Sequence, residues 1–73
     1  SYIMIPSHYK IISPEEKSIL HALKNEQLTS LQILKKVDSI SHILKVYSLL
    51  EGLNSKGLVS SHVIRNMKYH HIL

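Results

Sequence analysis

Residues 50–59 read LEGLNSKGLV, and within this stretch helical patterning gives way to strand patterning. Before it, apolar residues recur at steps of three and four, which is the spacing of one helix face. Gly57 is typical of the left-handed residue that follows the end of a helix. Leu58 and Val59 open a run rich in valine and isoleucine, which favours a β-strand. We therefore expect a long helix that ends at about Ser55 and a strand that follows it directly.

The long helix is predicted to start at the turn of residues 38–40. Its apolar positions are Ile40, Ile43, Leu44, Val46, Tyr47, Leu49, Leu50 and Leu53. This stripe is broad, so we expect much of the helix to be buried. A polar line remains opposite the stripe and consists of Ser41, Lys45, Ser48, Gly52 and Ser55, which follow one another at steps of three and four. Its side chains suited to hydrogen bonding with DNA are those of Ser41, Lys45 and Ser48, with His42 beside them. These four side chains are expected to face water.

Two β-like runs follow the long helix, at residues 58–64 and 68–73. Arg65-Asn66-Met67 between them predicts a turn, because asparagine accepts a positive φ. The two runs are therefore expected to pair as a hairpin whose tip carries Arg65, Asn66 and Lys68.

Two further helices are predicted upstream, each from a capping box. Ser-Pro-Glu-Glu at residues 13–16 combines such a box with proline at the first helical position, and predicts a helix over residues 14–25. Thr-Ser-Leu-Gln at residues 29–32 is a second box and predicts a short helix over residues 30–37. Residues 1–12 contain two short β-like runs and are expected to form an extended arm.

The motifs resemble those of one class of small domain. Residues 50–59 resemble the L-x-x-L-x-x-K-G-L-V signature that joins the recognition helix to the wing in bacterial and archaeal winged-helix regulators. Residues 29–37 are similar to their L-(S/T)-x-x-x-(I/L)-L second helix. The resemblance implies one α+β winged helix-turn-helix domain over residues 1–73. Its three helices would lie within residues 13–57, and its β-hairpin wing would be residues 58–73.

The resemblance also implies a function, namely binding of duplex DNA by a transcriptional regulator. The third helix would lie in the major groove, where exposed side chains reach base edges, and the wing would lie on the backbone. The residues expected to contact DNA are Ser39, Ser41, His42, Lys45 and Ser48 on or at the start of the third helix, Arg65, Asn66 and Lys68 on the wing, and Lys35 and Lys36 at the end of the second helix. Such proteins commonly act as dimers, so a homodimer is a candidate partner, and the arm is a candidate either for pairing across it or for covering a sheet edge.

Charge and composition agree with this interpretation without requiring it. The 73 residues suffice for one domain, and the formal charge of +4 favours an anionic partner. Most of the positive excess falls in the second half of the sequence. Two alternatives remain open. One is a winged-helix module that binds another protein within a larger assembly, and the other is binding of double-stranded or structured RNA.

Several other classes of function lack the residues that they need. The sequence has no cysteine, so it offers neither a disulfide nor a thiolate metal site. A metal site could be considered at three histidines of the hairpin, His62, His70 and His71. However, His70 and His71 are adjacent on a strand and point to opposite faces, and no nearby carboxylate completes a ligand set. No metal is therefore expected. No glycine-rich loop or catalytic constellation is present, so neither an enzyme nor a small-molecule cofactor is expected. No apolar run is long enough to span a membrane, and a cytoplasmic, intracellular protein is expected.

Overall fold

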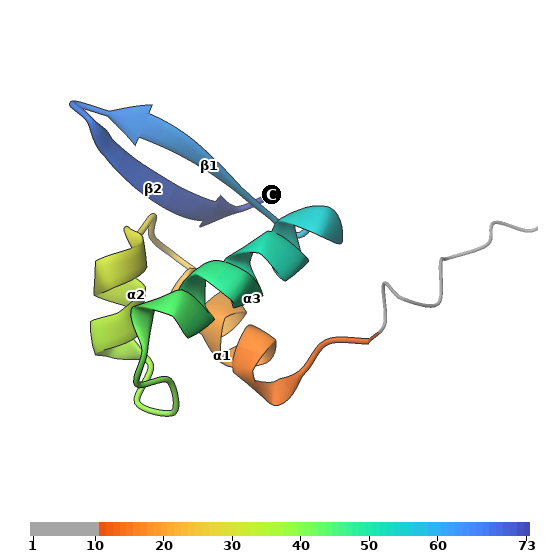
Figure 1. The fold of residues 1–73 in the computed structure, drawn as a ribbon. Coiled ribbons are helices and arrows are strands. Elements are labelled where there is room, and N and C mark those ends of the chain that lie inside the picture. The colour runs from red at the N-terminus through yellow and green to blue at the C-terminus, as the bar shows by residue number, and fades with distance from the viewer. Residues whose placement is uncertain (1–10) are drawn as a thin grey trace, which may run out of the picture.

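The computed structural model describes residues 11–73, which form three helices followed by an antiparallel hairpin (Figure 1). In chain order the elements are α1 (Pro14–Ala22), α2 (Ser30–Lys36), α3 (Ile43–Ser55), β1 (Val59–Ile64) and β2 (Met67–Ile72). The described chain is thus α+β, as the sequence predicts. The expected arm lies outside the described residues except for Ile11 and Ile12, which belong to no helix or strand.

Helix α1 begins at its predicted capping box and ends three residues before its predicted end. The Ser13 side chain accepts a hydrogen bond from the Glu16 amide at 3.1 Å, and the Glu16 carboxylate accepts one from the Ser13 amide at 3.0 Å. The expected end at residue 25 is wrong. The Lys24 amide donates to the His21 carbonyl, three residues back, so the chain tightens into a turn there.

Helix α2 also begins at its predicted capping box. The Thr29 hydroxyl accepts a hydrogen bond from the Gln32 amide at 3.2 Å, and the Gln32 side chain accepts one from the Thr29 amide at 2.9 Å. The helix ends at Lys36, one residue earlier than predicted, where Val37 turns to an extended conformation.

Helix α3 begins later than predicted but ends where it was expected. Its first helical residue is Ile43, and His42 is the N-cap. Ile40 is only 4% exposed, yet it is buried from the connecting loop and not from a helix. Ser39 and Ser41, which were expected on the helix or at its start, therefore lie in the loop before it.

The end of α3 is closed by a left-handed glycine. Gly57 has a φ of 76°. The amide of Leu58 donates to the carbonyl of Leu53 at 3.0 Å, and the amide of Gly57 donates to that of Asn54 at 3.0 Å. These two bonds form a Schellman motif, which satisfies carbonyls at the end of the helix and turns the chain into β1.

The hairpin is closed by a two-residue turn and not by the predicted three. Arg65 and Asn66 both have positive φ, 51° and 68°, as a type I′ turn requires. Ile64 therefore pairs with Met67, which belongs to β2. A turn over residues 65–67 would have paired Ile64 with Lys68, so the observed register differs from the predicted one by one residue.

The link between α1 and α2 pairs with the hairpin. The Leu28 amide donates to the His70 carbonyl at 3.0 Å, and the His70 amide donates to the Leu28 carbonyl at 2.7 Å. This antiparallel bridge gives β2 a neighbour on each side. It holds the base of the hairpin against the helices, and Figure 1 shows the hairpin running back above α3.

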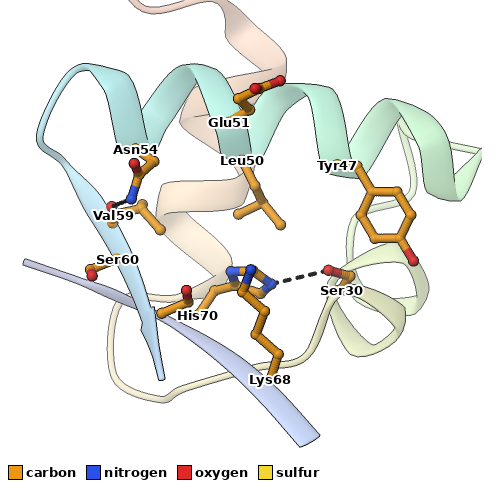
Figure 2. Close-up of a pocket in the computed structure, with 10 residues that line it drawn as sticks. Ser30, Tyr47, Leu50, Glu51, Asn54, Val59, Ser60, Lys68 and His70 are labelled. Carbon is orange, nitrogen blue, oxygen red and sulfur yellow. Dashed lines mark hydrogen bonds between the residues drawn. The ribbon is translucent and has the colours of Figure 1, made fainter. Parts of the chain in front are cut away.

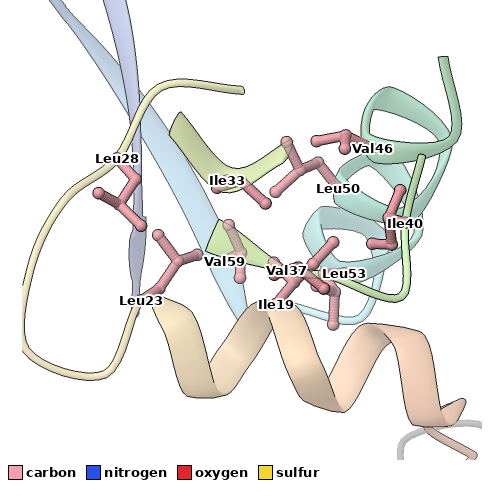
Figure 3. Packing of buried hydrophobic residues seen from close by; sticks show 10 residues of the cluster. All are labelled: Ile19, Leu23, Leu28, Ile33, Val37, Ile40, Val46, Leu50, Leu53 and Val59. Atoms are coloured by element: carbon pink, nitrogen blue, oxygen red, sulfur yellow. The ribbon is translucent and has the colours of Figure 1, made fainter. Parts of the chain in front are cut away.

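The core draws on the three helices, on β1 and on the loops between the helices (Figure 3). Its buried apolar residues are Ile19, Leu23, Leu28, Ile33, Val37, Ile40, Val46, Leu50, Leu53 and Val59. Of the other positions of the stripe predicted for α3, Ile43 and Leu49 are partly buried and pack against this cluster, whereas Leu44 is 73% exposed and Tyr47 is 52% exposed. The helix packs on one side only, so a stripe that extends around it cannot be buried entirely.

A buried ion pair joins α1 to the end of α3. Glu16 is 6% exposed, and its Oε1 accepts a hydrogen bond from Lys56 Nζ at 2.7 Å. The same ammonium group donates to the Ile11 carbonyl at 2.7 Å. Across residues 11–73, no helix has the length and hydropathy needed to cross a membrane.

Candidate nucleic-acid interface

The face of α3 that points away from the core is mixed in character. Leu44, Ser48, Glu51 and Ser55 follow one another at steps of three and four and are all exposed. An exposed hydroxyl at Ser48 is well suited to hydrogen bonding with a base edge or a phosphate, whereas the Glu51 carboxylate repels phosphate. The polar line predicted for this helix is therefore present at its centre and is bordered by an apolar residue and an acid.

Lys45 lies at the side of this face that is nearest α1. Its Nζ is 3.5 Å from Glu15 Oε1, and both side chains are partly exposed. Ser41 and His42 precede the helix and are exposed. Of the four side chains of the predicted polar line that were expected to contact DNA, only that of Ser48 occupies the centre of the outward face of α3.

An open groove of about 550 Å³ separates α3 from the hairpin (Figure 2). Tyr47 and Glu51 line it from α3, and Figure 2 shows Tyr47 pointing toward the start of α2. Ser30 of α2 lies below it, and Lys68 and His70 come from β2. The groove thus gathers one ammonium group, one carboxylate, a phenol, an amide, an imidazole and three serine hydroxyls between the two elements that were expected to contact DNA.

His70 closes the floor of the groove. Its side chain is nearly buried, and its Nε2 lies 3.1 Å from Ser30 Oγ. Burial, followed by the nearby charges of Lys68 and His71, lowers the pKa of His70 below its ordinary value of 6.5. The His70 side chain hydrogen-bonds to Ser30 as a neutral imidazole, and the His70 backbone pairs with Leu28. These contacts hold the hairpin against α2.

The tip of the hairpin carries the remaining predicted wing residues. Arg65 and Asn66 are exposed, and both occupy the left-handed region. Such a conformation costs a residue with a Cβ roughly 1–2 kcal/mol. Lys68 is exposed and shares a strand face with His70, because side chains alternate along β2. Lys68 therefore lines the groove, whereas Arg65 lies at the turn of the hairpin, outside the residues that line it.

All three ion pairs in residues 11–73 involve lysines outside the hairpin. Lys36 pairs with Glu26, Lys45 with Glu15 and Lys56 with Glu16. Within the same residues, neither Arg65 nor Lys68 forms an ion pair. Of the two elements expected to contact DNA, the hairpin therefore carries the unpaired cations, because Lys45 of α3 is paired. Lys17, Lys24 and Lys35, which lie on or beside α1 and α2, also form no ion pair within these residues.

Two predicted contact residues lie elsewhere on the molecule. Lys36 and Ser39 line a second groove, which runs between α1 and the end of α2 and shares no lining residue with the groove beside the hairpin. Lys35 is exposed on α2. The ten residues expected to contact DNA thus do not form one continuous surface.

The groove also contains residues that the sequence interpretation did not single out for binding. Ser30 and Glu51 had no assigned role, and Tyr47 was expected in the core. One feature of the sequence could have indicated that Tyr47 is exposed. The apolar stripe predicted for α3 is wider than the face that a helix packed on one side can bury.

No family model and no curated protein matches this sequence. What bears on its function is therefore the chain's own geometry, namely an outward α3 face, a groove beside it and a cationic hairpin tip.

Proposed function

We propose that this chain is a winged helix-turn-helix domain that binds duplex DNA and regulates transcription. The order of elements supports the fold, since α2 and α3 are joined by a short turn and α3 is followed by the hairpin. The observation that carries the function is the pair of hairpin cations, Arg65 and Lys68, beside the exposed face of α3. In this arrangement α3 enters the major groove and the hairpin contacts phosphates.

The strain at the hairpin tip adds support. A type I′ turn favours asparagine and glycine, yet its first position here holds an arginine. Residues in sparsely populated backbone regions cluster at functional sites. A long cation at an exposed turn reaches further toward a phosphate than the residues that would suit the turn best.

The test is a titration of duplex DNA with the domain at two salt concentrations. Binding through phosphates weakens with salt, with a log–log slope of about 0.9 for each phosphate neutralised. The double variant Arg65→Ala/Lys68→Ala should bind at least tenfold more weakly than the parent. Lys17→Ala/Lys24→Ala has the same net charge and removes lysines that line the second groove, so it should bind like the parent. Equal affinities for the two double variants, or no binding at low salt, would refute the proposal.

Dimerisation and location follow from the same proposal. A two-fold DNA site calls for two copies of the domain, and sedimentation with and without a two-fold duplex measures this. Action on DNA implies an intracellular, cytoplasmic protein that binds rather than catalyses.

A competition with double-stranded RNA separates the two nucleic acids, because A-form RNA has a deep and narrow major groove that does not admit α3.

A protein-binding module is the second candidate, and one observation favours it. Leu44 is 73% exposed at the start of α3, and Leu31 is 55% exposed on α2. Tyr47 is also half exposed, and exposed aromatic residues are enriched in protein interfaces. Absence of DNA binding at low salt, together with a loss of partner binding in Leu44→Ser, would favour this function over the first.

A further inference from the structure

Two histidines meet on the outer face of the hairpin. His62 pairs with Tyr69 across the strands, and His71 lies two residues further along β2, so the two histidines are diagonal neighbours on one face. Their Nδ1 atoms are 3.1 Å apart. Their ring centroids are 5.0 Å apart, with a 48° angle between the ring planes. The rings thus present two nitrogen atoms to the same point.

This separation suits two ligands of one metal ion. A zinc ion lies about 2.0–2.1 Å from a histidine nitrogen, so two nitrogens at the observed separation subtend roughly 100° at the metal. That angle falls between the right angle of square-planar or octahedral coordination and the tetrahedral angle.

We propose that His62 and His71 form a two-imidazole site for a divalent late transition-metal ion: Cu²⁺, Ni²⁺ or Zn²⁺. Imidazole suits these three ions, and the expected order of affinity places Cu²⁺ first. Among residues 11–73 no cluster of three or more potential ligands is present, so water completes the coordination. Tyr69 stacks against His62 with centroids 6.1 Å apart and helps to hold that ring in place.

The site is separate from the proposed DNA surface. Lys68 and His70 occupy the opposite face of β2, because side chains alternate along a strand. His70 points into the groove and cannot reach the same ion. The metal proposal therefore does not depend on DNA binding, and either can fail without the other.

A hydrogen bond between the two rings is the competing explanation for the short separation. It requires one Nδ1 to carry a proton, whereas a metal ion requires both Nδ1 atoms to be unprotonated. A variant that can still hydrogen-bond but is a poor metal ligand distinguishes the two. Asparagine at position 71 meets this requirement, because its amide group can donate to His62 Nδ1.

The experiment titrates the whole chain with CuCl₂, and separately with NiCl₂ and ZnCl₂, in a non-coordinating buffer at pH 7.4. Calorimetry should report one ion per chain, with Cu²⁺ the tightest and MgCl₂ silent. His62→Asn and His71→Asn should each lower the Cu²⁺ affinity at least tenfold. His21→Asn removes an exposed histidine of α1 and should change it less than twofold. Thermal unfolding checks that each variant is folded. Cu²⁺ binding that is unchanged in folded His71→Asn, or absent from the parent chain, would overturn the proposal.

Discussion

Lys56 Nζ lies 2.7 Å from Glu16 Oε1, and this contact fixes the start of α1 against the end of α3. One carboxylate has two roles there, because it also accepts the Ser13 amide in the capping box. Both partners are largely buried, with side-chain exposures of 18% for Lys56 and 8% for Glu16. Loss of either partner leaves the other in a poorly hydrated site.

Glu16→Gln should destabilise the domain by about 3 kcal/mol, since breaking a buried pair leaves an uncompensated charge. Urea unfolding measures this difference. Glu15→Gln is the matched control, because Glu15 forms a partly exposed pair with Lys45, and exposed pairs contribute about 0–1 kcal/mol. Equal losses in the two variants would contradict the role assigned to Glu16.

The same pair predicts how stability depends on pH. Burial raises the pKa of Glu16, but the hydrogen bonds from Lys56 and Ser13 and the charge of Lys56 outweigh it, so the pKa falls below 4.5. A carboxyl whose pKa is lowered by folding stabilises the protein above its unfolded pKa, and this contribution is lost as pH falls through its folded pKa. The stability difference between the parent and Glu16→Gln should therefore be full above pH 4.5 and shrink below it. A difference that is constant from pH 7 to pH 3 would contradict this.

Gly52→Ala should show energetic coupling to Glu16. A Cβ at position 52 would stand 3.0 Å from Glu16 Oε2, and Oε1 of the same carboxylate is held by Lys56 and Ser13. Alanine in a helix is otherwise favoured over glycine by about 1 kcal/mol. We expect Gly52→Ala to raise the free energy of unfolding by about 1 kcal/mol in a Glu16→Ala background. In the parent the gain should be smaller by at least about 0.5 kcal/mol, which is the usual size of the coupling between residues in contact. Equal effects in both backgrounds would show that the carboxylate moves aside without cost.

Arg65→Gly should have opposite effects on stability and on DNA binding. Glycine accepts the positive φ of the turn, so the fold should gain about 0.5–1 kcal/mol. Loss of the cation should weaken binding to all DNA sequences alike and lower the salt slope by about 0.9. Thermal unfolding and a salt series measure the two effects on the same samples. A variant that binds DNA as tightly as the parent would remove Arg65 from the interface.

Ser48→Asp should reduce DNA binding more than tenfold while the fold persists. Ser48 is exposed at the centre of the outward face of α3, where a carboxylate would repel phosphates. Ser18→Asp adds the same charge to α1 beside the second groove and should have little effect on affinity. Fluorescence anisotropy with a labelled duplex gives both affinities. Equal losses would indicate an effect of net charge alone.

The helix boundaries were predictable where a local motif specifies them. The capping boxes at Ser13 and Thr29 and the left-handed Gly57 depend only on residues close in sequence, and the structure confirms all three. No such motif marks the start of α3, because the N-cap His42 makes no side-chain hydrogen bond. Ile40 continues the apolar spacing but is buried from a loop, and periodicity does not distinguish these two cases.

The parts of the candidate site that depend on tertiary packing were harder to predict. The side of α3 that faces solvent is set by where α1 and the hairpin pack, so Tyr47 was wrongly expected in the core. The histidine pair depends on strand register. A three-residue turn at residues 65–67 would place His62 opposite His70, whereas the observed turn places it opposite Tyr69 and beside His71. An error of one residue in the turn therefore conceals the pair.

The backbone pairing of Leu28 with His70 sets an order of events during synthesis. All three helices are translated before residue 70, so the link after α1 emerges from the ribosome long before its pairing strand. Until β2 leaves the exit tunnel, the helices remain without the hairpin base that covers them, and their apolar faces stay open to chaperones. The native structure of this domain is therefore completed only after β2 has been synthesised, by a contact between residues far apart in the chain.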